Sequence, residues 1–260
     1  MLGGIIRQDT DMCMTVRASS AYCMDDQTEM NYGFPFIKLV IEDLSKQGVI
    51  NNEKGLIDLF NKTVVPVSKP DRNYFIPAER TPFIISFTHK YNNDRFWEEY
   101  GNHGYGICLI FDGDMLSDVA KQKTDAFLLD VAYLYNKPDY EVWSPLLQVI
   151  VMKIAELQFY SPLLKNEDVN KFQQAILERF CPVISALIKD GDIFAWENEV
   201  RWISICNGKT AKVNDLSKNY IDIRIPINCL KEIISGPKFD KQEELSLICN
   251  KYNLELKNQM

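Results

Sequence analysis

The stretch Phe194-Ala-Trp-Glu-Asn-Glu-Val-Arg-Trp-Ile203 decides how the rest of the chain is interpreted. Its pattern predicts a β-strand, in which successive side chains point to opposite faces. One face would carry mainly aromatic and apolar side chains and suits a protein core. The other would carry two carboxylates and a guanidinium. The first face consists of Trp196, Asn198, Val200 and Trp202, and the second of Glu197, Glu199 and Arg201.

The charged face has two interpretations. Glu197 and Glu199 repel each other, which tends to raise the pKa of at least one of them unless a cation such as Arg201 lies beside them. In the first interpretation the face is solvated and its ion pairs contribute at most about 1 kcal/mol, because antiparallel sheets often present a polar face to water. In the second, Glu197 and Glu199 form a catalytic Glu-x-Glu pair in a cleft.

A second strand, predicted over 82–88, shows the same division into an apolar and a polar face. We therefore expect the two strands to be neighbours in one sheet around a cleft. A third, shorter strand is expected over 12–19, and it carries Arg17. In the 82–88 strand, one face consists of Phe83, Ile85 and Phe87, and the other of Ile84, Ser86 and Thr88.

The remaining chain predicts a mixture of helices and strands, hence a single α+β domain over residues 1–260 with a helical insertion at 137–190. Apolar residues at helical spacing define the helices, and alternation or short apolar runs define the strands. Asp240 is the expected cap of the last helix. Helices are predicted over 36–47, 53–63, 92–101, 140–164, 167–189 and 240–256, and strands over 105–112 (central and covered on both faces), 131–135, 220–225 and 233–235.

Composition limits the function classes. The chain has 260 residues, 46% of them hydrophobic, and a net charge of −7, which argues against a protein that mainly coats nucleic acid or anionic membrane. The sequence shows neither a signal peptide nor a run long enough to span a bilayer. Seven cysteines without a Cys-x-x-Cys spacing suggest free thiols in a reducing cytoplasm, and with only two histidines no metal is expected.

The predicted helix at 92–101 places Phe96, Trp97 and Tyr100 on one face. Aromatic side chains at that spacing more often pack into a core than form a substrate platform. Trp97 and Tyr100 are retained as candidate ligand contacts.

Five segments, taken in order, resemble one group of bacterial proteins, a domain family catalogued without an assigned function. The resemblance covers residues 15 to about 250, and it depends on the order and spacing of the segments. That family in turn looks like a distant branch of the ADP-ribosyltransferase fold, a mixed and largely antiparallel sheet around a central cleft. The segments are Met24-Asp-Asp-x-x-Glu29, Ser86-Phe-Thr88, Trp97-x-x-Tyr-Gly101 with Gly106-x-Cys-Leu-Ile-Phe-Asp112, Phe194-x-x-Glu-x-Glu-x-Arg201 and Ile233-Ile-x-Gly-Pro237.

The resemblance implies an NAD-dependent ADP-ribosyltransferase or NAD glycohydrolase, such as a toxin or defence effector, with NAD as substrate and a protein or nucleic acid as acceptor. Glu199 would stabilise the oxocarbenium-like cation that forms as nicotinamide leaves, an electrostatic role. Glu197 would orient the nucleophile, and Ser86 and Thr88 would hold Glu199 and the ribose. The resemblance thus implies the catalytic residues Glu199, Glu197 and Ser86, and the candidate cofactor contacts are Thr88, Arg17, Arg201, Trp97 and Tyr100.

One departure from the pattern keeps other functions open. The related proteins carry a first strand with a Tyr, His or Arg ahead of the region matching Leu2 to Ile6, and the chain starts too late to include it. Arg17 or Arg7 could replace its phosphate contact. The first alternative is therefore a catalytically inactive protein of the same fold that binds a protein or nucleotide. The second is a hydrolase or nuclease that holds Mg²⁺ or Mn²⁺ on Glu197, Glu199 and Asp112.

Overall fold

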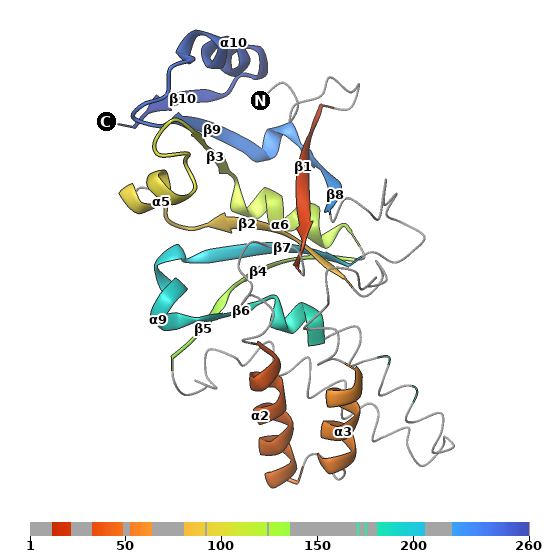
Figure 1. Cartoon of the computed structure of the whole chain (residues 1–260). Helices are drawn as coiled ribbons and strands as arrows, with labels where there is room; N and C mark the ends of the chain where they lie inside the picture. The colour runs from red at the N-terminus through yellow and green to blue at the C-terminus, as the bar shows by residue number, and fades with distance from the viewer. Residues whose placement is uncertain are drawn as a thin grey trace.

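The computed structural model describes residues 12–21, 33–48, 53–63, 81–91, 93–123, 125–135, 171, 175, 181–205 and 220–259, and these form an α+β structure with mostly antiparallel sheets. The largest sheet has five antiparallel strands and crosses the middle of the molecule (Figure 1). Its strands follow the order β4 (Ala126–Asp130), β7 (Glu199–Ile205), β2 (Pro82–Thr88), β1 (Cys13–Ser20) and β8 (Tyr220–Pro226).

The predicted neighbours are confirmed, because β2 pairs with β7 along its whole length. In this antiparallel register Ser86 lies opposite Arg201 and Thr88 lies opposite Glu199. Residues directly opposite each other share a face of the sheet. The alternation predicted for β2 and β8 is therefore also the alternation of the folded sheet.

One face of this sheet packs against a second sheet of three strands, and the interface forms an apolar core around Trp202, Ile223 and Ile233. In this second sheet the apolar segment expected to be a central strand is instead the edge strand, and its side chains are half-buried. Asp240 does not cap the last helix, which begins two residues later than predicted. The helix also ends four residues earlier than predicted, because Asn253 adopts a left-handed conformation. The elements are β10 (Glu255–Asn258), β9 (Leu230–Ser235) and β3 (Ile107–Phe111), with helices α6 (Gly113–Lys121) and α10 (Gln242–Tyr252) and the 3₁₀ turn η6 (Ile227–Cys229).

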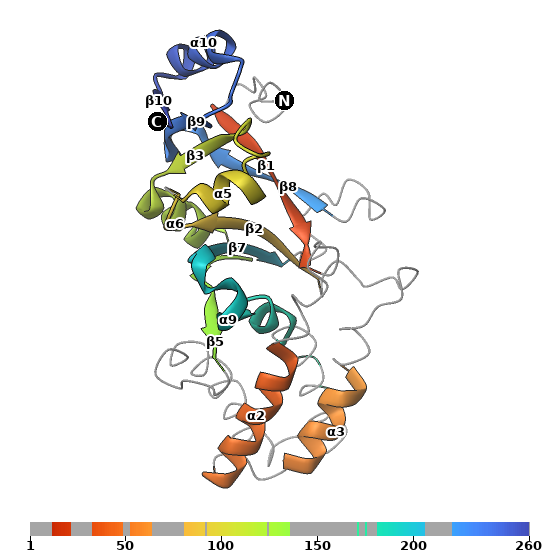
Figure 2. The same ribbon diagram turned by 60° about the vertical axis from the view of Figure 1, so that its left-hand side comes forward.

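The opposite face is covered over part of its area by helices, with Ile203 and Ile205 of β7 packed into a second apolar core. Both views place these helices at the far end of the molecule from the three-stranded sheet (Figure 2). Part of the predicted insertion is corrected, because 188–190 form a strand rather than the end of a helix; the rest of 137–190 lies mostly outside the described residues. These elements are α2 (Gly33–Lys46), α3 (Glu53–Thr63), a helical segment over 181–185, and the parallel pair β5 (Ala132–Leu134) and β6 (Ile188–Asp190).

The start of β7 also differs from the prediction. The chain passes through helix α9 (Gly191–Phe194) and the 3₁₀ turn η4 (Ala195–Glu197) before the strand begins at Glu199. Asn198 separates the turn from the strand with a φ of 44°, a left-handed conformation that asparagine tolerates better than most residues. Glu197 therefore does not belong to the same strand as Glu199, and Asn198 does not belong to the core face with Trp202.

No helix among the described residues is both long enough and apolar enough to cross a membrane. The segments 24–29 and 66–77 and the N-terminal residues up to Arg7 lie outside the described residues.

Candidate active site

Three adjacent strands bring the candidate polar residues to one face of the five-stranded sheet. Ser86 and Thr88 on β2 lie opposite Arg201 and Glu199 on β7. Ser19 of β1 lies opposite Ile84 of β2, so alternation along β1 puts Arg17 on the same face. Arg17, Ser86, Thr88 and Glu199 line one pocket of about 1690 Å³.

Strand β1 brings a basic residue to the pocket. It pairs with β2 on one side and with β8 on the other, and it carries a basic residue, Arg17, on the pocket face. The short strand predicted over 12–19 is confirmed. The missing first strand that the resemblance implies stays a prediction, because the residues ahead of Met12 lie outside the described part of the chain.

Glu199 is buried and doubly paired with Arg201, because the guanidinium and carboxylate lie side by side. The guanidinium donates from Nε to Oε1 at 2.8 Å and from Nη2 to Oε2 at 3.0 Å. A third donor of Arg201 bonds the backbone carbonyl of Ala186, and the Arg201 side chain is 0% exposed. The interpretation of this charged face as solvated is wrong, because both its members on β7 lie inside the protein.

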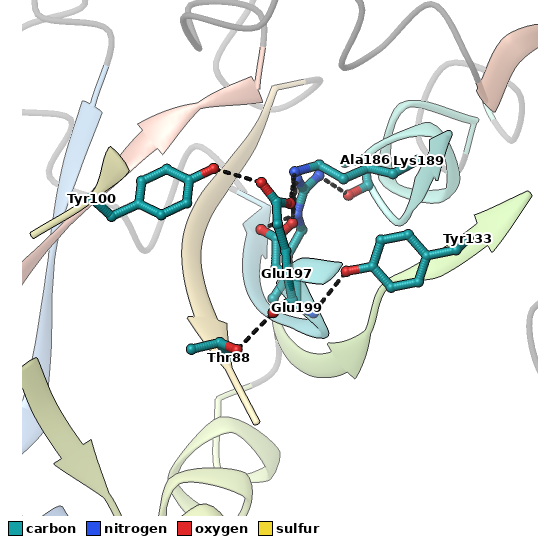
Figure 3. A network of polar contacts seen from close by, with 8 residues as sticks. Thr88, Tyr100, Tyr133, Ala186, Lys189, Glu197 and Glu199 are labelled. Atoms are coloured by element: carbon teal, nitrogen blue, oxygen red, sulfur yellow. Dashed lines mark hydrogen bonds and ion pairs between the residues drawn. The ribbon is translucent and has the colours of Figure 1, made fainter. Parts of the chain in front are cut away.

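A lysine that sequence reasoning missed joins the two glutamates. The Nζ of Lys189, on β6, lies 2.7 Å from Glu197 Oε2 and 2.8 Å from Glu199 Oε2. The Lys189 side chain is only 8% exposed, and the ring of Phe194 lies 4.9 Å from its Nζ. Figure 3 shows the ammonium reaching toward both carboxylates from the side opposite Tyr100. Glu197, Lys189, Glu199 and Arg201 thus form a continuous set of ion pairs, named here the charged tetrad.

The charges of the tetrad compensate one another. Burial alone would raise the pKa of Glu199, but Arg201 and then Lys189 outweigh it and hold the pKa below its usual range. Two carboxylates and two cations sum to zero net charge. Within the tetrad, each buried carboxylate therefore lies beside a cation.

The backbone around the Glu-x-Glu pair is fixed by two hydroxyl groups. Thr88 donates from Oγ1 to the carbonyl oxygen of Glu197 at 2.6 Å, and the amide of Glu199 donates to the phenol oxygen of Tyr133 at 2.7 Å. Burial raises the pKa of Tyr133 to about 12, so this phenol stays neutral. Thr88 is consequently placed to hold the Glu197 backbone.

Tyr100 reaches the tetrad from the opposite wall of the pocket. It follows helix α5 (Asp94–Glu99), whose N-cap is Asn93, and its hydroxyl donates to Glu197 Oε1 (Figure 3). Burial of the hydroxyl and the neighbouring Glu197 carboxylate raise the pKa of Tyr100 above its usual value. The whole side chain is nevertheless 63% exposed, so Tyr100 connects the buried carboxylate with the open pocket.

Aromatic rings surround this tyrosine. Trp196 stacks on Tyr100 with ring centroids 6.2 Å apart, and Phe96 lies 4.9 Å from Trp196. Trp97 is buried beneath them and also lines the pocket. A Cβ on Gly101 would lie 2.8 Å from the Trp97 backbone, so this close turn requires glycine. Trp97 therefore has the core role and Tyr100 the exposed one.

Arg17 is the exposed cation of the same face. Its Nε lies 3.9 Å from Asp222 Oδ1 on β8, and its guanidinium lies 3.6 Å from the centre of the Tyr220 ring. The side chain remains 61% exposed and accessible from the pocket. By contrast, the buried Arg201 does not line the pocket, so its position suits support of Glu199 rather than contact with a ligand.

Residues that sequence reasoning missed come from β5 and β6. Lys189 ends the run Val183-Ile-Ser-Ala-Leu-Ile188, and a lone lysine after such an apolar run could have been recognised as a buried, paired cation. No comparable sequence pattern indicated a role for Tyr133. Its role depends on the parallel pairing of β5 with β6, where Tyr133 lies opposite Lys189.

The acidic residues do not converge as a metal site would require. Among the residues described by the structure, no group of three or more His, Cys, Asp or Glu side chains is arranged to hold a metal ion. Asp112 caps α6 and pairs with Lys231 at 2.7 Å, and both contacts lower its pKa. Glu197 and Glu199 already share the ammonium of Lys189.

Comparison of the chain with protein-family models, with curated proteins and with solved structures gives no significant match. The function is therefore inferred from the geometry of the pocket and from the residues that line it.

Proposed function

We propose that the protein cleaves the bond between nicotinamide and ribose in NAD, as an ADP-ribosyltransferase or NAD glycohydrolase. One observation supports this most strongly: β1, β2 and β7 lie side by side and place Arg17, Ser86, Thr88 and Glu199 on one face of one pocket. The volume of about 1690 Å³ exceeds that of typical pockets for small ligands, which suits a ligand as large as a dinucleotide.

In this proposal the residues divide between binding and catalysis. The exposed guanidinium of Arg17 suits the pyrophosphate, because arginine donors match phosphate oxygens. The exposed hydroxyl of Ser86 suits the ribose. Glu199 supplies a fixed carboxylate next to the carbon that becomes positively charged, and such preorganised charge is a large contribution to catalysis.

The reaction would proceed by loss of the leaving group. The C1′–N bond breaks, and its electron pair neutralises the pyridinium as nicotinamide departs. The remaining oxocarbenium-like ribose is attacked by water or by an acceptor hydroxyl or amine. The nucleophile loses one proton to a base. Glu197 is the candidate base, because it shares the Lys189 ammonium with Glu199 and Tyr100 links it to the pocket.

A second candidate function is NAD or nucleotide binding without cleavage. The observation that favours it is the charged tetrad, because both oxygens of Glu199 already accept hydrogen bonds or ion pairs from Arg201 and Lys189. A carboxylate compensated in this way attracts a developing cation less strongly than an unpaired one.

Nicotinamide release from NAD by the purified chain tests the proposal, with Glu199→Gln as the test variant. Glutamine keeps the shape of the side chain and removes its charge. Glu243→Gln is the matched control, because Glu243 is exposed on α10 and does not line the pocket. We expect release by the wild type and the control, and a loss of at least about 100-fold in Glu199→Gln, the size typical for one stabilising group.

Equal release by Glu199→Gln would contradict the catalytic role of this residue. A melting temperature that rises with NAD, without nicotinamide release, would favour the binding function. Addition of cell lysate identifies the acceptor class, since label from NAD stays on proteins or nucleic acid only if transfer occurs.

A further inference from the structure

Lys189 places a buried positive charge directly between the two glutamates of the pocket wall. The ammonium lies between two carboxylates, 2.7 Å from Glu197 and 2.8 Å from Glu199, and it is almost completely buried. It nevertheless borders the pocket, as do both glutamates. A cation from the protein thus occupies the place where the Glu-x-Glu pair would otherwise present two negative charges.

We propose that Lys189 is a specificity-determining residue that sets the net charge of the tetrad, and with it the preference between the cationic and the neutral form of the nicotinamide ring. This inference rests on the proposed NAD function. The oxidised dinucleotide carries a positive pyridinium ring, whereas the reduced dinucleotide has nearly the same shape and an uncharged ring. The four charges of the tetrad cancel, so the wild-type tetrad itself distinguishes the two forms only weakly.

The arithmetic of the tetrad makes the prediction specific. Glu197 and Glu199 contribute −2, and Lys189 and Arg201 contribute +2. Removing the lysine charge leaves −1 and favours the cationic ring. Removing the Glu197 charge leaves +1 and favours the neutral ring. Because the tetrad is buried, water screens these changes less than it screens charges on the surface.

Several contacts fix the position of the Lys189 ammonium inside the protein. The strand β6 pairs with β5, the Phe194 ring centre lies 4.9 Å from the ammonium, and the two carboxylates lie 2.7 and 2.8 Å from it. The Tyr100 hydroxyl donates a hydrogen bond to Oε1, the other carboxylate oxygen of Glu197. A ligand therefore meets a preformed, compensated surface.

The experiment measures dissociation constants for oxidised and reduced NAD by calorimetry and compares their ratio across variants. We expect Lys189→Gln to shift the ratio about tenfold toward the oxidised form, and Glu197→Gln to shift it about tenfold toward the reduced form, as one buried charge near the ring requires. The double variant Lys189→Gln/Glu197→Gln restores neutrality and should return the ratio to that of the wild type. Lys121→Gln, which removes an exposed lysine on α6 outside the pocket, should leave the ratio unchanged.

A merely structural role for Lys189 would change both constants together and leave their ratio unmoved. Unchanged ratios in both Lys189→Gln and Glu197→Gln, with binding retained, would overturn the inference while leaving the proposed function intact. Failure of the wild type to bind either dinucleotide would overturn the proposed function and this inference with it. If Lys189→Gln does not fold, the opposite shift in Glu197→Gln still decides, because it tests the same charge arithmetic.

Discussion

Two ion-pair regions share one face of the five-stranded sheet, and they differ in nearly every physical respect. The charged tetrad around β7 is buried, and Glu199 pairs with Arg201 through two hydrogen bonds. The pair of Arg17 with Asp222, across β1 and β8, is exposed and loose, with 3.9 Å between the nearest charged atoms. The buried charges of the tetrad therefore stabilise the structure, whereas the exposed Arg17 is accessible to a ligand.

Breaking the buried region should have the largest effect. Arg201→Met keeps most of the aliphatic part of the side chain but removes the guanidinium. Glu199 is then a buried carboxylate that has lost its bidentate partner and keeps Lys189. We expect the free energy of unfolding to fall by about 3–5 kcal/mol. Urea denaturation followed by circular dichroism measures it, and a loss below about 1 kcal/mol would show that the tetrad does not stabilise the fold.

Acid should weaken the same region without mutation. The folded pKa of Glu199 lies below its ordinary value, so its ionisation adds stability that is complete above that ordinary value, near pH 4.5, and is lost as the pH falls through the folded pKa. Between pH 7 and pH 3 the free energy of unfolding should therefore fall more for the wild type than for Glu199→Gln. Parallel curves for the two proteins would contradict this assignment.

Tyr100→Phe should have a smaller effect, because the tyrosine ring is mostly exposed. The variant removes the hydroxyl donor of Glu197 and keeps the stacking on Trp196. Removing a hydrogen bond to a charged group at such a site should cost about 1 kcal/mol. Denaturation measures this cost, and Tyr105→Phe, an exposed tyrosine with no bond to the tetrad, serves as the control.

The smallest effect is expected at the exposed pair. Asp222→Asn should change the free energy of unfolding by at most about 0.5 kcal/mol, since exposed ion pairs contribute little and salt screens them. Added salt should abolish even this difference. A loss comparable to that of Arg201→Met would remove the distinction between the two regions.

Local pattern was sufficient for most of the sheet. The alternation in 220–225 is confirmed in β8, where one face packs into a core and the other is exposed. In β2 the two faces also separate, but Ile84 packs into the second core, so only Ser86 and Thr88 form the polar part of its face. The same reasoning failed at Glu197. The alternating pattern of the sequence extends back past Glu197, but the backbone there is not a strand. A 3₁₀ turn and the left-handed Asn198 precede β7.

The residues that β2 and β7 contribute to the candidate site were predictable, but Lys189, Tyr133 and the electrostatics of the site were not. Ser86, Thr88 and Glu199 were placed together correctly, since the pairing of two strands determines them. Burial of the charged face depends instead on residues 181–190, which cover it from elsewhere in the chain. Lys189 contributes through that coverage, and no pattern within β7 could reveal it.

The most direct test of the central claim is a crystal structure of the wild-type protein with a carbocyclic NAD analogue, in which a methylene replaces the ring oxygen of the nicotinamide ribose and prevents cleavage. We expect this ribose to lie within hydrogen-bond distance of Ser86 and beside Glu199, with the pyrophosphate next to Arg17. An analogue bound elsewhere on the protein, or bound with its ribose away from β2 and β7, would contradict the proposed NAD site.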